Sequence, residues 1–373
     1  MRVQPFFGFR SAERLTLTAR ALRSQEPMFA SRSFLRDVRT MLGQYASHEV
    51  PGVEIEFEHL SSDGASIKHS ATTDDEGFAR FDFAFGSPKA RPARTVWEKA
   101  TLRWQPIAGE HDGGEVTAHI LVPGTQAQLG IISDIDDTIM ETGITGNIRA
   151  IARNWKRVMA QMPGERILVP GAREFYSALG GAPSGSNGPT TIAGTDNAIT
   201  RDRPIFYVSS SPWNLFSYLV TFKHQRELPL GPIMLRDWGF NRRTLGAQGH
   251  GSHKLEAINR ILDHYPDLQF ALVGDDTQKD LMAFAKVVGE QPDRIAAVFI
   301  RAVARKANSE ANAAARTSIE KAGVPFWTGS DYGATEGFLR EIGLQHDTEV
   351  EDLVKAGQEQ PTHRTNRNTG SNS

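Results

Sequence analysis

The sequence predicts an α/β protein in which a doubly wound parallel sheet follows a β-sandwich-like domain. Before about residue 127, apolar and polar residues alternate with a period of two. After it, short continuous apolar runs are separated by segments with helical spacing. Alternation is typical of antiparallel strands with one face in water, whereas strands of a parallel sheet are buried on both faces and are apolar throughout. The change of pattern therefore predicts two domains.

Residues 1–127 are predicted to form the β-sandwich-like accessory domain. The alternation is clearest over residues 53–58, 81–85 and 116–122. The segments SSDGAS and TTDDEGFA are rich in the residues that hairpin turns favour. Such turns would join neighbouring strands into an antiparallel sheet.

Residues 128–344 are predicted to form the domain with the parallel sheet. Its expected strands are the runs LGIIS, IFYVS, FALVG and IAAVFI, and one-sided helical patterns cover residues 148–159, 215–222 and 255–262. Strands that alternate with helices in this way are typical of a doubly wound sheet. Residues 180–204 are rich in Gly, Ser, Thr and Pro and are predicted to be a flexible insertion, and residues 345–373 a largely disordered tail.

Composition limits the classes of function. The 373 residues carry a formal net charge of -2, which does not favour binding to nucleic acid through global charge. The chain has no cysteine, which excludes disulfides and thiolate metal sites and fits a reducing compartment. Its apolar runs are shorter than the ~18 residues that a membrane span needs. We expect a cytoplasmic protein and leave peripheral contact with a membrane open.

Polar side chains follow the predicted strands of the parallel sheet. The first strand is followed by Asp134, Asp136, Asp137 and Thr138, and the second ends in Ser209, Ser210 and Ser211. Lys254 begins the helix before the third strand, and the third strand is followed by Asp275, Asp276 and Asp280. Ligands of open parallel sheets bind beyond the carboxyl ends of the strands. We therefore expect one crevice that gathers acids, hydroxyls and one ammonium group.

The residue types in this crevice favour phosphoryl chemistry. Clustered carboxylates suit a hard cation, and Mg²⁺ suits a site that also holds phosphate. Of Asp134 and Asp136, one can stay ionised as a nucleophile while the other serves as an acid. A phosphomonoester dianion beside ionised Asp134 and Asp275 carries about four negative charges, of which one Mg²⁺ and Lys254 cancel about three. Ser209 can donate a hydrogen bond to a phosphoryl oxygen.

The order of these motifs resembles that of a known superfamily. The chain is similar to the haloacid dehalogenase superfamily of phosphatases in the order of its motifs. These are Asp-x-Asp-x-Thr after an apolar strand, then a strand that ends in Ser, then Lys, and then Gly-Asp-Asp with a later Asp. Over roughly residues 128–305, the chain resembles the catalytic domain of the actin-patch-associated phosphatidate phosphatases, and lipins are more distant relatives. The segments that carry this resemblance are SDIDDTI, PGAREFYSAL, FYVSSSPWNLF, LRDWG, HKLEAI, YPDLQFALVGDD and DRIAAVFIR. The resemblance implies a Rossmann-like, haloacid dehalogenase-like fold.

The resemblance also implies roles for residues. Asp134 would attack phosphorus and form an aspartyl-phosphate. Asp136 would protonate the departing oxygen and then deprotonate the water that hydrolyses the intermediate. Ser209 and Lys254 would bind the phosphoryl oxygens, with Ser210 beside them.

By the same resemblance, Mg²⁺ would be held by Asp134, the backbone carbonyl of Asp136, and Asp275. Asp280 would support the metal shell, and Thr138 would orient the loop. Asp276 stands where relatives often carry Ser, so whether Asp275 or Asp276 ligates the metal stays open.

The expected reaction is Mg²⁺-dependent hydrolysis of phosphatidate to diacylglycerol and phosphate. Two alternatives stay open: the same mechanism on a small soluble phosphomonoester, and a catalytically idle lipid-binding module. The motifs bear on the chemistry, whereas phosphatidate itself follows only from the family.

Overall fold

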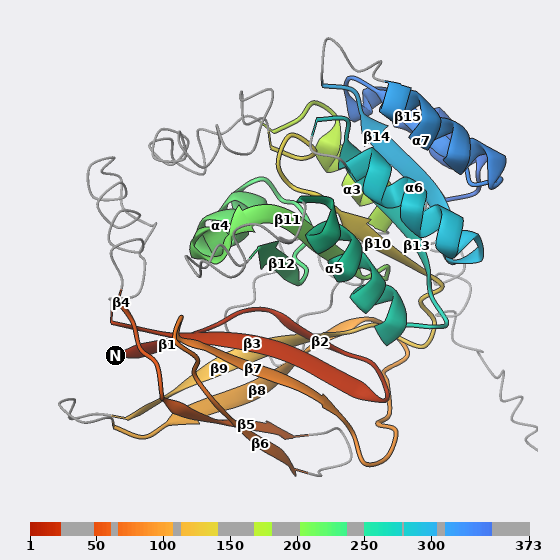
Figure 1. Ribbon diagram of the computed structural model, residues 1–373. Helices are drawn as coiled ribbons and strands as arrows, with labels where there is room; N and C mark the ends of the chain where they lie inside the picture. Colours follow the sequence, from red (N-terminus) through yellow and green to blue (C-terminus); the bar gives the residue numbers. More distant parts are fainter. Residues whose placement is uncertain are drawn as a thin grey trace, which may run out of the picture.

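Figure 1 shows a computed structural model of the chain, which describes residues 1–23, 48–60, 66–106, 113–140, 168–180, 202–236, 250–277, 280–303 and 310–344. An antiparallel sheet lies on one side and a parallel sheet with its helices on the other. The predicted helix over 148–159, nearly all of the predicted insertion and the predicted tail lie outside these residues. None of the described helices has both the length and the apolar character that crossing a membrane requires.

The first part of the chain forms one nine-stranded sheet. Its strands are β1 (Arg2–Pro5), β2 (Gly8–Arg10), β3 (Arg14–Arg23), β4 (His48–Glu49), β5 (Glu54–Leu60), β6 (Ser66–Thr72), β7 (Phe78–Ala84), β8 (Val96–Trp104) and β9 (Gly114–Val122). They run in the order β1-β3-β2-β9-β8-β5-β6, while β4 and β7 pair with β3. Neighbours are antiparallel except β2 and β9, which are parallel.

The predicted alternation is confirmed in this sheet. Along β5, Ile55 and Phe57 are buried and alternate with more exposed glutamates. They join Leu17 of β3, Phe81 of β7 and Leu102 of β8 in a core that belongs to the first part of the chain. One continuous sheet therefore supplies its own apolar interior.

The predicted parallel sheet is also confirmed. It has six strands in the order β12-β11-β10-β13-β14-β15, all paired in parallel. The strands are β10 (Leu129–Ser133), β11 (Ile205–Pro212), β12 (Ile233–Arg236), β13 (Gln269–Asp275), β14 (Ile295–Arg301) and β15 (Phe326–Gly329). The order of the strands reverses between β10 and β13. The carboxyl ends at such a switch point are where open α/β sheets bind ligands.

Helices cover both faces of the parallel sheet. One face packs against α3 (Ala172–Gly180), α4 (Phe216–Gln225) and α8 (Thr335–Glu341), and the other against α5 (His250–His264), α6 (Asp280–Glu290) and α7 (Glu310–Lys321). Consecutive side chains of β10 point to opposite faces, so Ile131 joins the first core and Ile132 the second. This two-sided burial explains why the strands are apolar throughout.

The turn between β1 and β2 packs against the segment that follows β11 in the parallel-sheet part of the chain. Phe6 lies against Trp213 with ring centroids 4.4 Å apart, and against Phe216 at 4.9 Å. Arg20 of β3 donates a hydrogen bond to the side chain of Asn214 (2.8 Å). The first part of the chain therefore contacts the connection between β11 and α4 and the first residue of α4, just after the predicted serines at the end of β11.

Candidate active site

The loop after β10 makes a tight turn that begins with Asp134. The backbone N–H of Asp134 still donates to the carbonyl of Val273 (2.8 Å), so this residue continues the ladder between β10 and β13. The chain then turns through Asp137, whose φ of 59° lies in the left-handed region that Asp tolerates better than most residues. Arg301 of β14 donates to the carbonyl of Asp137 (2.8 Å) and so stabilises the turn.

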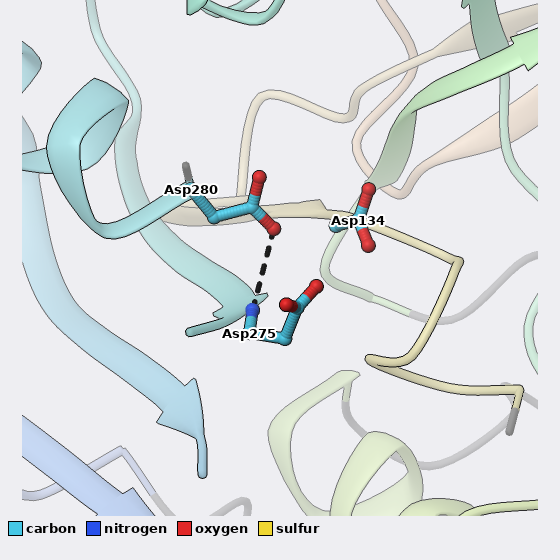
Figure 2. A group of neighbouring side chains, drawn as sticks. All are labelled: Asp134, Asp275 and Asp280. Atoms are coloured by element: carbon cyan, nitrogen blue, oxygen red, sulfur yellow. Dashed lines mark hydrogen bonds between the residues drawn. The ribbon is translucent and has the colours of Figure 1, made fainter. Parts of the chain in front are cut away.

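Three carboxylates, those of Asp134, Asp275 and Asp280, form an acidic cluster at the switch point between β10 and β13. Oxygens of Asp134, Asp275 and Asp280 lie within 4.8 Å of one another, and all three residues are buried. Figure 2 shows the three side chains close together, one just after β10, one at the end of β13 and one at the start of α6. The N–H of Asp275 donates to a carboxylate oxygen of Asp280 at 3.3 Å. The sequence therefore brings together acids from three separate elements.

Gly274 allows this close approach. A Cβ at this position would lie 2.8 Å from the Cβ of Asp280 and 2.8 Å from one of its carboxylate oxygens. Such distances are too short for carbon atoms, so a larger residue would push α6 away from the strand end. The glycine of the Gly-Asp-Asp motif is thus a packing requirement of the acidic cluster.

Lys254 of α5 is the cation that the described residues place in this cluster. Its Nζ donates to Oδ1 of Asp134 at 2.7 Å and makes a second, very short contact with Oδ1 of Asp280. Burial lowers the pKa of Lys254, but the charges of Asp134, Asp280 and Asp275 outweigh burial and raise it overall. The ammonium group therefore stays charged in the interior.

One lysine does not neutralise three buried acids. Burial raises the pKa of Asp134 well above its usual value; the charge of Lys254 opposes this, and neighbouring acids add to it. Burial, followed by the charge of Asp280, raises the pKa of Asp275 to about 7. With all three acids ionised, the cluster and Lys254 together carry two surplus negative charges. A divalent cation is the natural way to remove that surplus.

The residues present fit a hard divalent cation. Oxygen ligands are what Mg²⁺ prefers, and the acidic cluster supplies them from three side chains. Oδ2 of Asp134 is buried, and the described residues offer it no hydrogen-bond partner. A buried acceptor without a donor is costly unless a ligand completes it. That atom is the open acceptor to which a cation or a substrate would bind.

Asp136 lies apart from the acidic cluster and among hydroxyls. Its Oδ2 accepts hydrogen bonds from Ser209 (2.8 Å) and from Ser211 (2.9 Å) of β11. The backbone N–H of Ser211 donates in turn to Oγ of Ser209 at 3.0 Å. Ser210 is buried beside them. The two acids of the Asp-x-Asp motif thus have different environments, one beside an ammonium and one beside serines.

The remaining predicted residues occupy distinct positions. Thr138 lies near the acidic cluster, and its Oγ1 is 3.4 Å from Oδ2 of Asp275. Of the consecutive residues Asp275 and Asp276, it is Asp275 that lies in the acidic cluster. The carboxylate of Asp276 instead accepts a hydrogen bond from the backbone N–H of Val303 (2.8 Å). Sequence reasoning did not identify the contacts of Ser211 and Arg301. The run of three serines was the available signal for Ser211.

The part of the chain that holds this site is similar to known proteins. Residues 129–302 match the family model of the catalytic domain of phosphatidate phosphatase APP1. Phosphatidate phosphatase APP1 of Saccharomyces cerevisiae is 31% identical over 173 residues, which are 46% of this chain and 26% of that protein. An uncharacterized protein of Schizosaccharomyces pombe is 24% identical over 176 residues, 47% of this chain and 25% of its own length.

The chain thus spans about a quarter of the length of these curated relatives. Among solved structures, chitinase ChiW of Paenibacillus sp. str. FPU-7 is 8% identical and covers 92% of this chain and 24% of its own, with a TM-score of 0.19. A similarity at that level carries no argument about the fold.

Proposed function

We propose that this protein is a Mg²⁺-dependent phosphatase, because residues 129–302 match the family model of the APP1 phosphatidate phosphatase catalytic domain. The proposed substrate is phosphatidate, and the products are diacylglycerol and inorganic phosphate. The strand order of the parallel sheet supports a Rossmann-like, haloacid dehalogenase-like catalytic domain. The proposed place of action is the cytoplasm, with peripheral contact to the membrane that holds the lipid.

One observation carries this proposal: three acids and one lysine from different elements converge at a single switch point. They are Asp134, Asp275, Asp280 and Lys254. A phosphomonoester needs positive charge around its oxygens and a nucleophile in line with phosphorus. The acidic cluster supplies the nucleophile and the ligands for a cation, and Lys254 supplies a fixed ammonium group.

Asp134 is the proposed nucleophile. Its Oδ1 is held by Lys254 at 2.7 Å, which leaves the buried Oδ2 for attack on phosphorus. Attack would form an aspartyl-phosphate and break the bond between phosphorus and the glycerol oxygen. Asp136 would give that oxygen a proton as it departs, and would then take a proton from the water that cleaves the aspartyl-phosphate.

The proposed ligands of Mg²⁺ are Asp134, the backbone carbonyl of Asp136, and Asp275, with Asp280 supporting them. When bound, the cation would neutralise charge on the phosphoryl oxygens and on the acids that face them. Lys254 would add its own charge to the same oxygens. Ser209, with Ser210 beside it, would donate a hydrogen bond to the phosphoryl group, and Thr138 would keep the loop in place.

The experiment that tests this proposal measures phosphate release with Mg²⁺ and with a chelator. Wild type is compared with Asp134→Asn, which keeps the shape of the nucleophile and removes its reactivity. Asp276→Asn is the matched control, because Asp276 bonds to the backbone of Val303 and lies outside the acidic cluster. We expect Asp134→Asn to lose at least about 10³-fold in turnover, as removal of a covalent nucleophile does, while Asp276→Asn stays near wild type.

The substrate is tested in the same assay. Phosphatidate in detergent micelles is compared with glycerol phosphate and with a nucleotide. Preference for phosphatidate, with a rate that follows its surface concentration, supports the lipid enzyme. Equal turnover of glycerol phosphate favours a phosphatase for small soluble substrates. Turnover by Asp134→Asn near the wild-type rate refutes Asp134 as the nucleophile. A wild-type protein that releases phosphate from none of these substrates favours the catalytically idle lipid-binding module.

A further inference from the structure

We propose that Ser211 is a positioning residue that keeps the carboxylate of Asp136 aimed at the leaving group while Ser209 is bound to the phosphoryl group. This inference rests on the proposed function and adds to it a residue that neither the sequence motifs nor the comparisons assign. Its basis is the pair of hydroxyls on one oxygen of Asp136.

The geometry places both serines on the same carboxylate oxygen. Ser209 and Ser211 are two residues apart on β11, so both side chains lie on the same side of the strand. Their Oγ atoms are 2.8 Å and 2.9 Å from Oδ2 of Asp136. All three residues are buried. Neither serine therefore occupies Oδ1, the oxygen of Asp136 that carries the proton in the proposed reaction.

Proton counting separates the roles of the two serines. A hydroxyl has one proton to donate, so Ser209 cannot donate to Asp136 and to a phosphoryl oxygen at the same time. When Ser209 turns to the phosphoryl group, as its proposed role requires, Asp136 loses one of its two hydroxyl donors. Among the described residues, Ser211 is the remaining side chain that donates to that carboxylate. Asp136 then depends on Ser211 for its orientation.

Ser211 also favours the product of proton transfer. As the bond from phosphorus to the leaving oxygen breaks, that oxygen takes the electron pair and receives the proton from Oδ1 of Asp136. Asp136 becomes a carboxylate, and the hydrogen bond from Ser211 to Oδ2 stabilises the charge left there. Hydrogen bonds to charged groups are the stronger class, so we expect loss of Ser211 to slow this step about 10- to 100-fold.

The test uses leaving groups that differ in their need for a proton. Glycerol phosphate and phosphatidate have alkoxide leaving groups, which depart slowly without protonation, whereas p-nitrophenyl phosphate releases a stable phenolate. For Ser211→Ala we expect kcat on the alkyl phosphates to fall about 10- to 100-fold and kcat on p-nitrophenyl phosphate to change less than about 3-fold. For Ser209→Ala we expect both substrates to lose affinity and turnover together.

Two further variants separate positioning from a general structural effect. Ser211→Thr keeps a hydroxyl at the same position and should recover the alkyl-phosphate rate. In an Asp136→Asn background, where no proton can be passed, Ser211→Ala should have no further effect on the alkyl phosphates.

Equal losses of Ser211→Ala on both substrate types, or no loss on either, overturn this inference and leave the proposed function standing. A wild-type chain that hydrolyses neither substrate overturns the proposed function and this inference with it.

Discussion

Lys254→Met removes the ammonium group from the acidic cluster and keeps a side chain of similar length. In the native protein, Nζ of Lys254 contacts Asp134 at 2.7 Å and also contacts Asp280, and all three side chains are buried. The variant leaves Asp134, Asp275 and Asp280 together without that cation. The acids must then take up protons or repel one another in an interior that solvates charge poorly.

The magnitude follows from the burial of the pair. Breaking a buried ion pair by removing one partner costs about 3–5 kcal/mol, because the remaining charge is left uncompensated. At ~2–4 °C per kcal/mol for a domain of this size, the melting temperature should fall by roughly 6–20 °C. Mg²⁺ should recover part of this loss, because it replaces some of the missing positive charge.

The assay is thermal unfolding of both proteins in chelator and in Mg²⁺, at the same pH. Lys286→Met is the matched control, since Lys286 is exposed on α6 and its ion pair with Glu290 is long at 3.9 Å. Exposed pairs of this kind contribute little, so the control should change stability by less than ~1 kcal/mol. If Lys254→Met in chelator melts within a degree or two of wild type, the acidic cluster does not need its lysine and the electrostatic reasoning is wrong.

Two other predictions follow from the site and from the contact between the two parts of the chain. The folded-state pKa of Asp275 is raised to about 7 from 3.8. Between these values the folded state therefore holds a proton that the unfolded chain has lost, and stability from this group falls as pH rises through the window. Mg²⁺ must displace that proton in order to bind. We therefore expect Mg²⁺ to raise the melting temperature of the protein more at pH 8 than at pH 6. An equal increase at both pH values, or a larger one at pH 6, would contradict a role of Asp275 as a metal ligand. Phe6→Ala removes a buried ring that contacts Trp213 and Phe216. We expect the free energy of unfolding, measured in urea, to fall by about 3–5 kcal/mol. A fall below ~1 kcal/mol would mean that this contact does not hold the two parts of the chain together.

Much of the architecture could be predicted because it depends on local pattern. The alternation along β5 indicated which side chains are buried, since the two faces of an antiparallel strand differ in their exposure to water. The apolar runs at β10 and β13 indicated strands that helices cover on both faces. The helix over 148–159 and the segment 181–201 lie outside the described residues and stay predictions.

The candidate site could be predicted only in part. Two strand ends and one predicted helix start placed Asp134, Asp275 and Lys254 at one expected edge of the sheet. The structure brings the two acids into one cluster and Lys254 into contact with Asp134. Spacing did not distinguish Asp275 from Asp276, because consecutive residues after a strand can face either way. It also did not predict that Ser211, rather than Ser210, shares Asp136 with Ser209.

An α/β architecture with an antiparallel sheet followed by a parallel one, and the residue types that follow the first strands of the parallel sheet, could be predicted from local pattern, because they depend on the burial of each segment. Only the tertiary structure decided which oxygen faces which donor and that the β1–β2 turn packs on the connection after the serines. Many of those contacts join residues far apart in the chain; Asp136 and Ser209, for example, are 73 positions apart. Their geometry is set by how strands and helices pack in three dimensions.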